Sequence, residues 1–487
     1  MLGFCAGLQI WVSAYRILVI IFYFAYMSPL FTNDAVVLGI LLIVLALIFY
    51  TESLESPGWK KFYTYVPALL LCYFVPALLN WPTGLIAPHW YDDGLLQFAS
   101  SNNLNIASGM SYDQITAFLN DSGFTKDDYG KYQHHSQLYY VASRYLLPAS
   151  LILLCLSIDL KSLMGLGPKA LIMFFTATIG IIIGGPIALL LVSAVAPDML
   201  GANPTEVWQG LSTVAGSWIG GGANQTAMKE VYEVSDNLFG TMIVVDVVVA
   251  NIWMGFLLFG ASRSDKIDKF LKADNSSITK LKNQVSEYRE SIKRMPDTTS
   301  LFVMLAVAFG GVGLAHWGKD IIAPFMTRYK DTLASMNLNS LTSTFFWLVV
   351  IATTFGLAIS FTRFRKLEGI GASRWGSIFI YMLVATIGMK MNLGEVLQNL
   401  GLFSIGLVWM AVHVILLLTV AKLIKAPFFF VAVGSQANIG GAASAPIVAS
   451  AFNPSLAPVG VLMAVLGYAL GTYGAIICAT LMQYVSG

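Results

Sequence analysis

The sequence predicts an all-α polytopic membrane protein built from two inverted repeats, and three observations support this prediction. Hydrophobic residues make up 57% of the 487 residues and charged residues only 11%, with a mean hydropathy of +0.71. Ten apolar runs offer about 20 residues of helix each, the length that crosses the hydrocarbon core of a bilayer. The charged residues gather between these runs, as they do in membrane-spanning chains.

The sequence contains ten predicted membrane spans. These spans lie at residues 35–51, 62–80, 138–158, 169–196, 238–260, 301–318, 341–361, 375–391, 401–424 and 458–484. Residues 1–27 are also apolar and lack a clear cleavage site, so we expect an extra helix or signal anchor, or a wrongly assigned start. Two more apolar segments, 206–233 and 427–452, are interrupted by glycine and amide side chains.

Lysine and arginine favour the cytoplasmic side of a membrane, which predicts the topology. Residues 262–300 carry nine Lys and Arg against six acids, so we expect this linker in the cytoplasm. Residues 81–137 carry six Asp and two Lys and are expected to be an external insertion. The sides of the membrane assigned to these loops are mutually consistent only if segments 206–233 and 427–452 do not cross. Each segment would then be a re-entrant hairpin, the first entering from outside and the second from the cytoplasm. Broken helices that cross completely are the alternative.

Five crossings and one hairpin in each half place the second half upside down relative to the first. Residues 219–221 (Ile-Gly-Gly) recur as residues 439–441, and residues 158–160 resemble 391–393 more weakly. We therefore expect a first inverted repeat at 28–261 and a second at 301–487. The linker 262–300 has apolar residues at three-four spacing, which predicts an amphipathic helix that lies on the membrane or pairs with a partner helix.

The two interrupted segments are the best candidates for a binding site, because irregular backbone at membrane depth must line protein or a wet cavity. Glycine lets a ligand approach the backbone, helix N-termini attract anions, and amide or hydroxyl oxygens can coordinate a cation. Close helix packing is the alternative explanation for the glycines. The predicted substrate-binding residues are Ser217, Gly220, Gly221, Asn224, Gln225, Thr226, Ser435, Gln436, Asn438, Gly440, Gly441 and Ser444.

Asp246 interrupts a valine-rich run and Asn251 follows five residues later. An ionisable residue inside a membrane is costly and marks a functional position by default. We expect the pair to bind Na⁺ or carry a proton as the coupling ion. A structural hydrogen bond to a neighbouring helix is the other explanation for Asp246.

Other residue patterns exclude or weaken several classes of function. A net charge of +2 without a basic stripe gives no sign of a nucleic-acid partner. The four cysteines lie in apolar stretches without metal-ligand spacing, and we expect no metal centre and no cofactor. His134 and His135 near Asp127 suggest at most a weak metal site in a solvated loop.

The hairpin glycines, residues 30–36 and residues 246–251 resemble the integral-membrane family known as domain of unknown function 819, over roughly residues 28–485. The paired glycine-rich hairpins also look like those of sodium–glutamate and sodium–citrate symporters. That resemblance implies ion-coupled uptake of an organic anion by a core domain that moves through a dimeric scaffold. The amides in these hairpins differ from the residues that those symporters have there, so the solute need not be an anion and an amino acid is a second expectation. The wider family's association with cell-wall fragments adds cell-wall-derived peptides as a third.

The predicted function is therefore ion-coupled secondary transport in the cell (inner) membrane by a homodimer surrounded by lipid. A passive channel is the main alternative, since a pore also uses irregular backbone. An intramembrane serine protease is a more distant one, based on Ser212 within a Gly-x-Ser motif and His413 as its base. We expect no enzyme.

Overall fold

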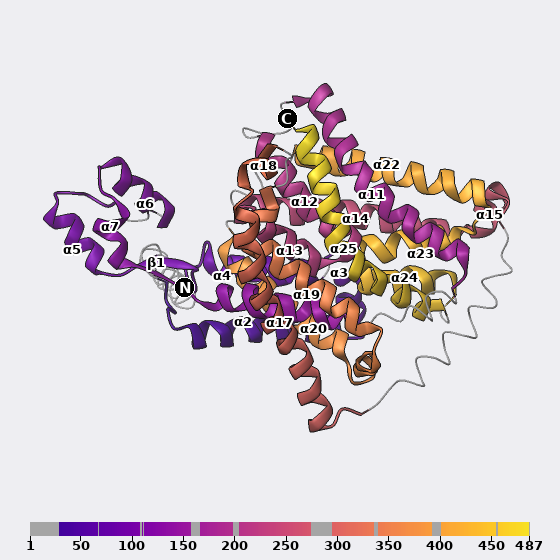
Figure 1. Cartoon of the computed structure of the whole chain (residues 1–487), viewed down its shortest axis with the longest axis horizontal. Helices are drawn as coiled ribbons and strands as arrows, with labels where there is room; N and C mark the ends of the chain where they lie inside the picture. The colour runs from indigo at the N-terminus through magenta and orange to yellow at the C-terminus, as the bar shows by residue number, and fades with distance from the viewer. Residues whose placement is uncertain are drawn as a thin grey trace, which may run out of the picture. The chain divides into compact units, whose positions relative to one another are not determined.

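The computed structural model is mainly helical and confirms the all-α polytopic membrane class (Figure 1). It describes residues 29–66, 68–107, 110, 112–156, 166–197, 204–273, 295–335, 339–391, 401–453 and 456–486. Among these residues, eight helices are long and apolar enough to cross a membrane, or ten if each of two bent helix pairs forms one span. These elements coincide with the ten predicted spans. The predicted helix at residues 1–27 lies outside the described residues.

The chain divides into two compact units, of which the first contains Met1–Ala142 and Tyr381–Gly394. Its helix α2 begins after Asn33, whose side chain accepts a hydrogen bond from the Ala35 amide at 2.8 Å. Helices α3 and α4 form one of the bent pairs, with an angle of 85° between them. The elements are α2 (Asp34–Glu52), α3 (Pro57–Tyr65), α4 (Ala68–Asn80), β1 (His89–Tyr91), α5 (Gly94–Ser101), α6 (Tyr112–Asp121), α7 (Lys126–Tyr129), the 3-10 helix Gly130–Tyr132, β2 (Gln133–His135) and α8 (Leu138–Val141).

The predicted insertion at residues 81–137 has a hydrophobic core of its own. Strands β1 and β2 pair antiparallel, so that Trp90 lies opposite His134. Helices α5, α6 and α7 gather beside this strand pair (Figure 1) and enclose a cluster of buried side chains. The cluster consists of Tyr91, Leu95, Ile115, Leu119 and Tyr129.

The second unit contains Ser143–Ile380 and Glu395–Gly487. A π-helical turn at Ala142–Leu146 leads into α9, so that Leu138–Leu156 counts as one span, and α20 contributes to both units. The elements are α9 (Leu147–Leu156), α11 (Pro168–Val195), α12 (Pro204–Gly220), α13 (Gly222–Val231), α14 (Asp236–Ala261), α15 (Ser264–Leu271), α17 (Thr298–Thr327), α18 (Lys330–Ser335), the 3-10 helices Asn339–Thr342 and Arg363–Ile370, α19 (Thr344–Ser360), α20 (Ala372–Lys390), α22 (Leu402–Ile424), α23 (Phe428–Ile439), α24 (Gly441–Phe452) and α25 (Ala457–Val485).

Both interrupted segments fold back on themselves as helical hairpins. The rings of Trp208 and Tyr232, near the two ends of α12 and α13, lie 5.3 Å apart between centroids. Phe429 and Phe452, near the two ends of α23 and α24, lie 5.4 Å apart. A straight helix would separate residues 24 positions apart by about 36 Å. The segments are therefore not single helices that run straight through, and Figure 1 shows α23 and α24 side by side.

Each hairpin turns at a glycine that adopts a positive φ. Gly221 separates α12 from α13 with φ +76°, and Gly441 begins α24 with φ +57°. Side chains with a Cβ rarely adopt this conformation, so glycine is required at both breaks. We call α12 with α13 the first hairpin and α23 with α24 the second hairpin.

The order of elements repeats, with a long helix, a hairpin and a long helix in each half. Helices α11 and α22, which precede the two hairpins, pack antiparallel, since Gly180 lies against His413 and Gly184 against Trp409. Antiparallel packing of equivalent helices is what an inverted repeat requires. The limits of the two compact units do not coincide with the predicted repeats, so the repeat boundaries 28–261 and 301–487 stay a prediction. Residues 158–160 and 392–393 lie outside the described residues.

Most of the predicted amphipathic linker at 262–300 also lies outside the described residues. Its first part forms α15, in which Leu271 is buried. Asp268 of α15 accepts a hydrogen bond from the Phe428 amide at 2.8 Å, at the first residue of the second hairpin. The start of the linker is thus attached to the base of that hairpin.

Candidate functional site

The tips of the two hairpins meet on one helix, α25. A Cβ placed on Gly467 of α25 would lie 2.7 Å from the Ile219 carbonyl oxygen and 3.5 Å from that of Ala437. Gly220 packs equally closely, because a Cβ there would lie 2.6 Å from the Gly471 Cα. Small residues on α25 therefore let both tips approach the same stretch of backbone.

Each tip carries a fully buried asparagine that is bound by a helix of the other half. Asn224 accepts a hydrogen bond from Thr472 of α25 at 2.6 Å and donates to the Gly220 carbonyl at 2.9 Å. Asn438 accepts from Thr178 of α11 at 2.8 Å and donates to the Gly434 carbonyl at 3.0 Å. These two predicted site residues use their amides to hold the hairpins, and their binding of a solute stays a prediction.

Asp246 lies at the first hairpin and binds two of the predicted residues. Its carboxylate accepts hydrogen bonds from Ser217 Oγ at 2.6 Å, Trp218 Nε1 at 2.7 Å and Gln225 Nε2 at 3.0 Å. The side chain is only 5% exposed. Three neutral donors thus hold a buried carboxylate between α14 and both arms of the hairpin.

Helix α14 also reaches the second hairpin, seven residues further on. Trp253 Nε1 donates to Ser435 Oγ at 2.8 Å, and His413 Nε2 of α22 lies 2.8 Å from the same hydroxyl. Residues seven apart share a helix face, so Asp246 and Trp253 present one polar stripe to both hairpins. Asn251 is about 140° away from Asp246 around the helix and is not brought to this stripe.

The remaining predicted residues surround the breaks. Gly221, Gly440 and Ser444 are half-buried, as is Gly222, which was not predicted, whereas Gly441 and most residues around them are buried. Gln436 Nε2 donates to Ser444 Oγ at 2.7 Å, and its Oε1 is buried without a hydrogen-bond partner among the described residues. Thr226 donates to the Gly222 carbonyl at 2.8 Å within its own helix. Glycine backbone and Ser444 are therefore the more exposed groups at the breaks, and Gln436 is buried behind Ser444.

A charged network beside the first hairpin was missed in the sequence. Lys229, which is 5% exposed, lies 2.9 Å from Asp236, and Glu230 lies 2.8 Å from Arg144 in the π-helical turn before α9. Arg144 also lies over the Phe345 ring at 4.4 Å. The signal was available, because charged residues within apolar segments are rare and paired.

The two residues of the protease alternative are not paired with each other. Ser212 Oγ donates to the Gln209 carbonyl of its own helix at 2.5 Å. His413 instead contacts Ser435, and both of these residues are fully buried. The geometry therefore gives no support to a Ser212–His413 nucleophile and base.

Comparison with known proteins identifies the family. The chain is 23% identical over 357 residues to the uncharacterized membrane protein YjcL of Bacillus subtilis (strain 168), an alignment that covers 69% of this chain and 82% of that relative. A family model described as a protein of unknown function, DUF819, matches residues 128–485, which include both hairpins and Asp246 but not residues 30–36. The chain is thus a multi-pass membrane protein that belongs to the DUF819 family.

Proposed function

We propose that this protein is an ion-coupled secondary transporter of a small polar solute, working by elevator-type alternating access. The observation that supports this proposal is the meeting of two glycine-broken hairpins on Gly467 of α25. Discontinuous helices that meet from opposite repeats are a recurrent way to build a solute site within a membrane. A permanently packed bundle does not need two breaks at one place.

The solute would bind at the breaks. The amides of Gly222 and Ala223 begin α13 and have no carbonyl partner within that helix, so they can bind a negatively charged group. The Gln436 Oε1 and Ser444 can bind a polar or amino group of the same solute. An organic anion, an amino acid or a cell-wall-derived peptide has groups of both kinds.

The coupling ion, Na⁺ or a proton, would act at Asp246. The hydrogen-bond donors around this carboxylate are neutral, so a bound proton or cation would neutralise a buried charge. Because Ser217 and Gln225 lie on the two arms of the first hairpin, a change at Asp246 would reach the tip directly. Coupling therefore needs no distant pathway.

The setting of this transporter is part of the same proposal. We place it in the cell (inner) membrane as a homodimer, with the linker 262–300 in the cytoplasm and the insertion 81–137 outside. The distribution of Lys and Arg supports this orientation. The arrangement would have the hairpins enter from opposite faces.

Flux in proteoliposomes tests the proposal against a passive channel. Purified protein is reconstituted, and uptake of labelled carboxylates, amino acids and short peptides is measured with a Na⁺ gradient, a proton gradient or neither. Solutes for this assay are chosen by thermal stabilisation of the purified protein, since a ligand stabilises the state that it binds. We expect saturable uptake that collapses when the gradient is dissipated. Linear flux that ignores both gradients would show a channel and refute the proposal.

A further inference from the structure

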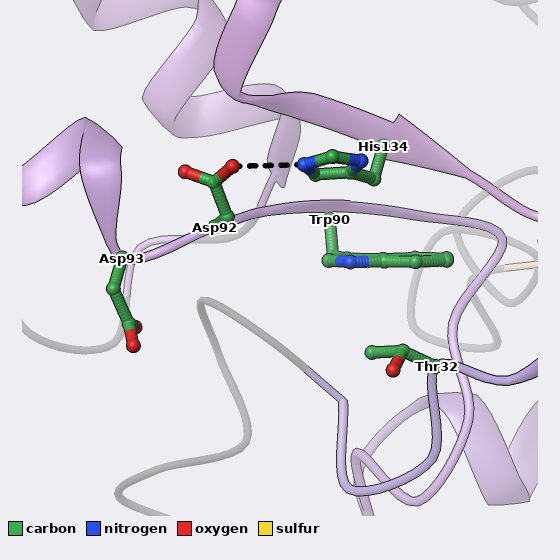
Figure 2. A pocket seen from close by; sticks show the side chains of 5 residues that line it. All are labelled: Thr32, Trp90, Asp92, Asp93 and His134. Carbon is green, nitrogen blue, oxygen red and sulfur yellow. Dashed lines mark hydrogen bonds and ion pairs between the residues drawn. The ribbon is translucent and has the colours of Figure 1, made fainter.

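The insertion carries a hollow that has no part in the proposed transport site. It has a volume of 390 Å³ and is lined by Thr32, Trp90, Asp92, Asp93 and His134 (Figure 2). Trp90 and His134 are cross-strand partners in β1 and β2, Asp92 and Asp93 join β1 to α5, and Thr32 precedes α2. All five residues belong to the first compact unit.

One wall of the hollow is held in place before any ligand arrives. The Trp90 and His134 rings stack with 6.1 Å between centroids and 21° between planes. Asp92 fixes this stack, because one carboxylate oxygen lies 2.8 Å from His134 Nε2 and the other accepts from the Gly94 amide at 2.9 Å. A preorganised wall loses little conformational entropy when a ligand binds.

The opposite face of the Trp90 ring is turned to the hollow. Figure 2 shows the indole between His134 on one side and Thr32 on the other, with the Asp93 carboxylate on the Thr32 side. Asp93 precedes α5 but its side chain does not cap that helix, and no hydrogen bond or ion pair engages it among the described residues. This carboxylate is thus free to bind a ligand.

The groups on the free side of the Trp90 ring are electron-rich. An indole face, a carboxylate and a hydroxyl oxygen attract a cation, and an ammonium ion over a tryptophan ring is a favourable pair. The charge of the whole insertion acts in the same direction, since six Asp and two Lys in residues 81–137 leave a net charge of −4. Metal binding is less suited to this hollow, because Asp92 is occupied and no group of three metal-ligating residues occurs among the described residues.

We propose that this hollow binds an organic cation, with an ammonium group between the free face of Trp90 and the carboxylate of Asp93. The ligand class follows from the negative charge and the aromatic face of the lining. The proposal does not depend on the proposed transport function. Thr32 bounds the site on the side of the Trp90 ring that lies away from His134.

Fluorine NMR of the full-length protein labelled with fluorotryptophan tests the proposal. The protein has 11 tryptophans, and the Trp90 signal is the one that disappears in Trp90→Phe. The probe is tetramethylammonium chloride, with sodium chloride at equal ionic strength and the neutral isostere tert-butanol as controls. We expect a saturable shift of the Trp90 signal with tetramethylammonium and with neither control. Equal shifts with either control, or no saturable shift, would overturn the proposal.

Two substitutions locate the site and control for overall charge. Asp93→Asn should weaken tetramethylammonium binding by about two- to fivefold, the range of an exposed ion pair. Asp127→Asn removes the same charge from an exposed position outside the hollow and should leave the affinity unchanged. The other tryptophan signals report folding in each variant. If Asp93→Asn is poorly folded, Thr32→Val, which replaces a lining hydroxyl by a methyl group, should also weaken tetramethylammonium binding, and unchanged affinity would refute the site. Equal loss of affinity in Asp93→Asn and Asp127→Asn would show general charge attraction and refute the site.

Discussion

The replacement Asp246→Asn separates a coupling role for this residue from a purely structural one. Trp218 Nε1 can only donate, so the asparagine oxygen must face it. The asparagine amino group then faces Ser217, whose hydroxyl can accept, and Gln225, whose amide can turn to present its oxygen. At most one of the three hydrogen bonds is lost in this arrangement.

The expected loss of stability is therefore limited. A hydrogen bond to a charged group contributes about 1.5–3 kcal/mol, and removing a buried charge offsets part of that loss. We expect the melting temperature of the purified variant to fall by about 10 °C or less. Gradient-driven uptake in proteoliposomes should nevertheless fall to the level of empty liposomes. The neutral asparagine amide does not take up a proton, and it has no negative charge to neutralise a bound cation.

Two control variants make the result interpretable. Trp218→Phe removes one donor but keeps the carboxylate, so it should lose comparable stability and retain gradient-driven uptake. Asp265→Asn changes an exposed carboxylate of α15 and should alter neither property. Undiminished uptake by Asp246→Asn would refute coupling at this residue. Loss of uptake by Asp246→Asn and Trp218→Phe alike would identify the hydrogen-bonded cage as a structural support.

Three further perturbations test the packing around the hairpins and the insertion. Gly220→Ala should cost about 1–3 kcal/mol of stability by overpacking, measured by thermal unfolding, because the new methyl group meets the α25 backbone; Gly255→Ala, which meets nothing within 4 Å, should cost nothing. Glu230→Gln removes the partner of Arg144 and should destabilise the purified protein by more than about 1 kcal/mol, and an unchanged melting temperature would show that this pair is dispensable. The amide and hydroxyl of Thr125 donate to Asp128 and lower the pKa of its carboxyl. The contribution of this carboxylate to the stability of α7 is therefore present above the ordinary Asp pKa and is lost as the pH falls through the lowered pKa. Proteolysis of the insertion should therefore increase as the pH falls through that range in the wild type, and Asp128→Asn should remove the pH dependence.

Much of the fold could be predicted from the sequence, because the membrane imposes strong rules on composition. The ten spans follow from apolar length alone, and the glycine breaks follow from Ile-Gly-Gly in both halves. The distribution of Lys and Arg favoured re-entrant hairpins over crossing helices, but glycine content alone does not predict that each segment folds back. The folding back depends on contacts between distant residues, such as Phe429 with Phe452, that no local pattern specifies.

The arrangement of the candidate site could be predicted only in part. Asp246 was singled out by the cost of a charge in the membrane and the tips by their irregular backbone, but the sequence could not show which helices the asparagines of the tips contact. Their partners, Thr472 and Thr178, are ordinary residues in long apolar helices until the fold brings them to Asn224 and Asn438. For Arg144 and Glu230 the charges within apolar segments were a usable signal, but their pairing could not be read from the sequence because the two residues stand 86 positions apart.

The exchange of partners between the halves bears directly on how such a protein could move. Asn224 of the first hairpin is bound by Thr472 of the second half, and Asn438 of the second hairpin is bound by Thr178 of the first half. Each hairpin tip is therefore anchored to a long helix of the opposite repeat, while α14 contacts both hairpins through Asp246 and Trp253. A motion that separated the two tips would break buried hydrogen bonds in both halves at once. We therefore expect the hairpins and helices α11, α14, α22 and α25 to move together as one body, with the weaker joints lying where this body meets α9, α17 and α19.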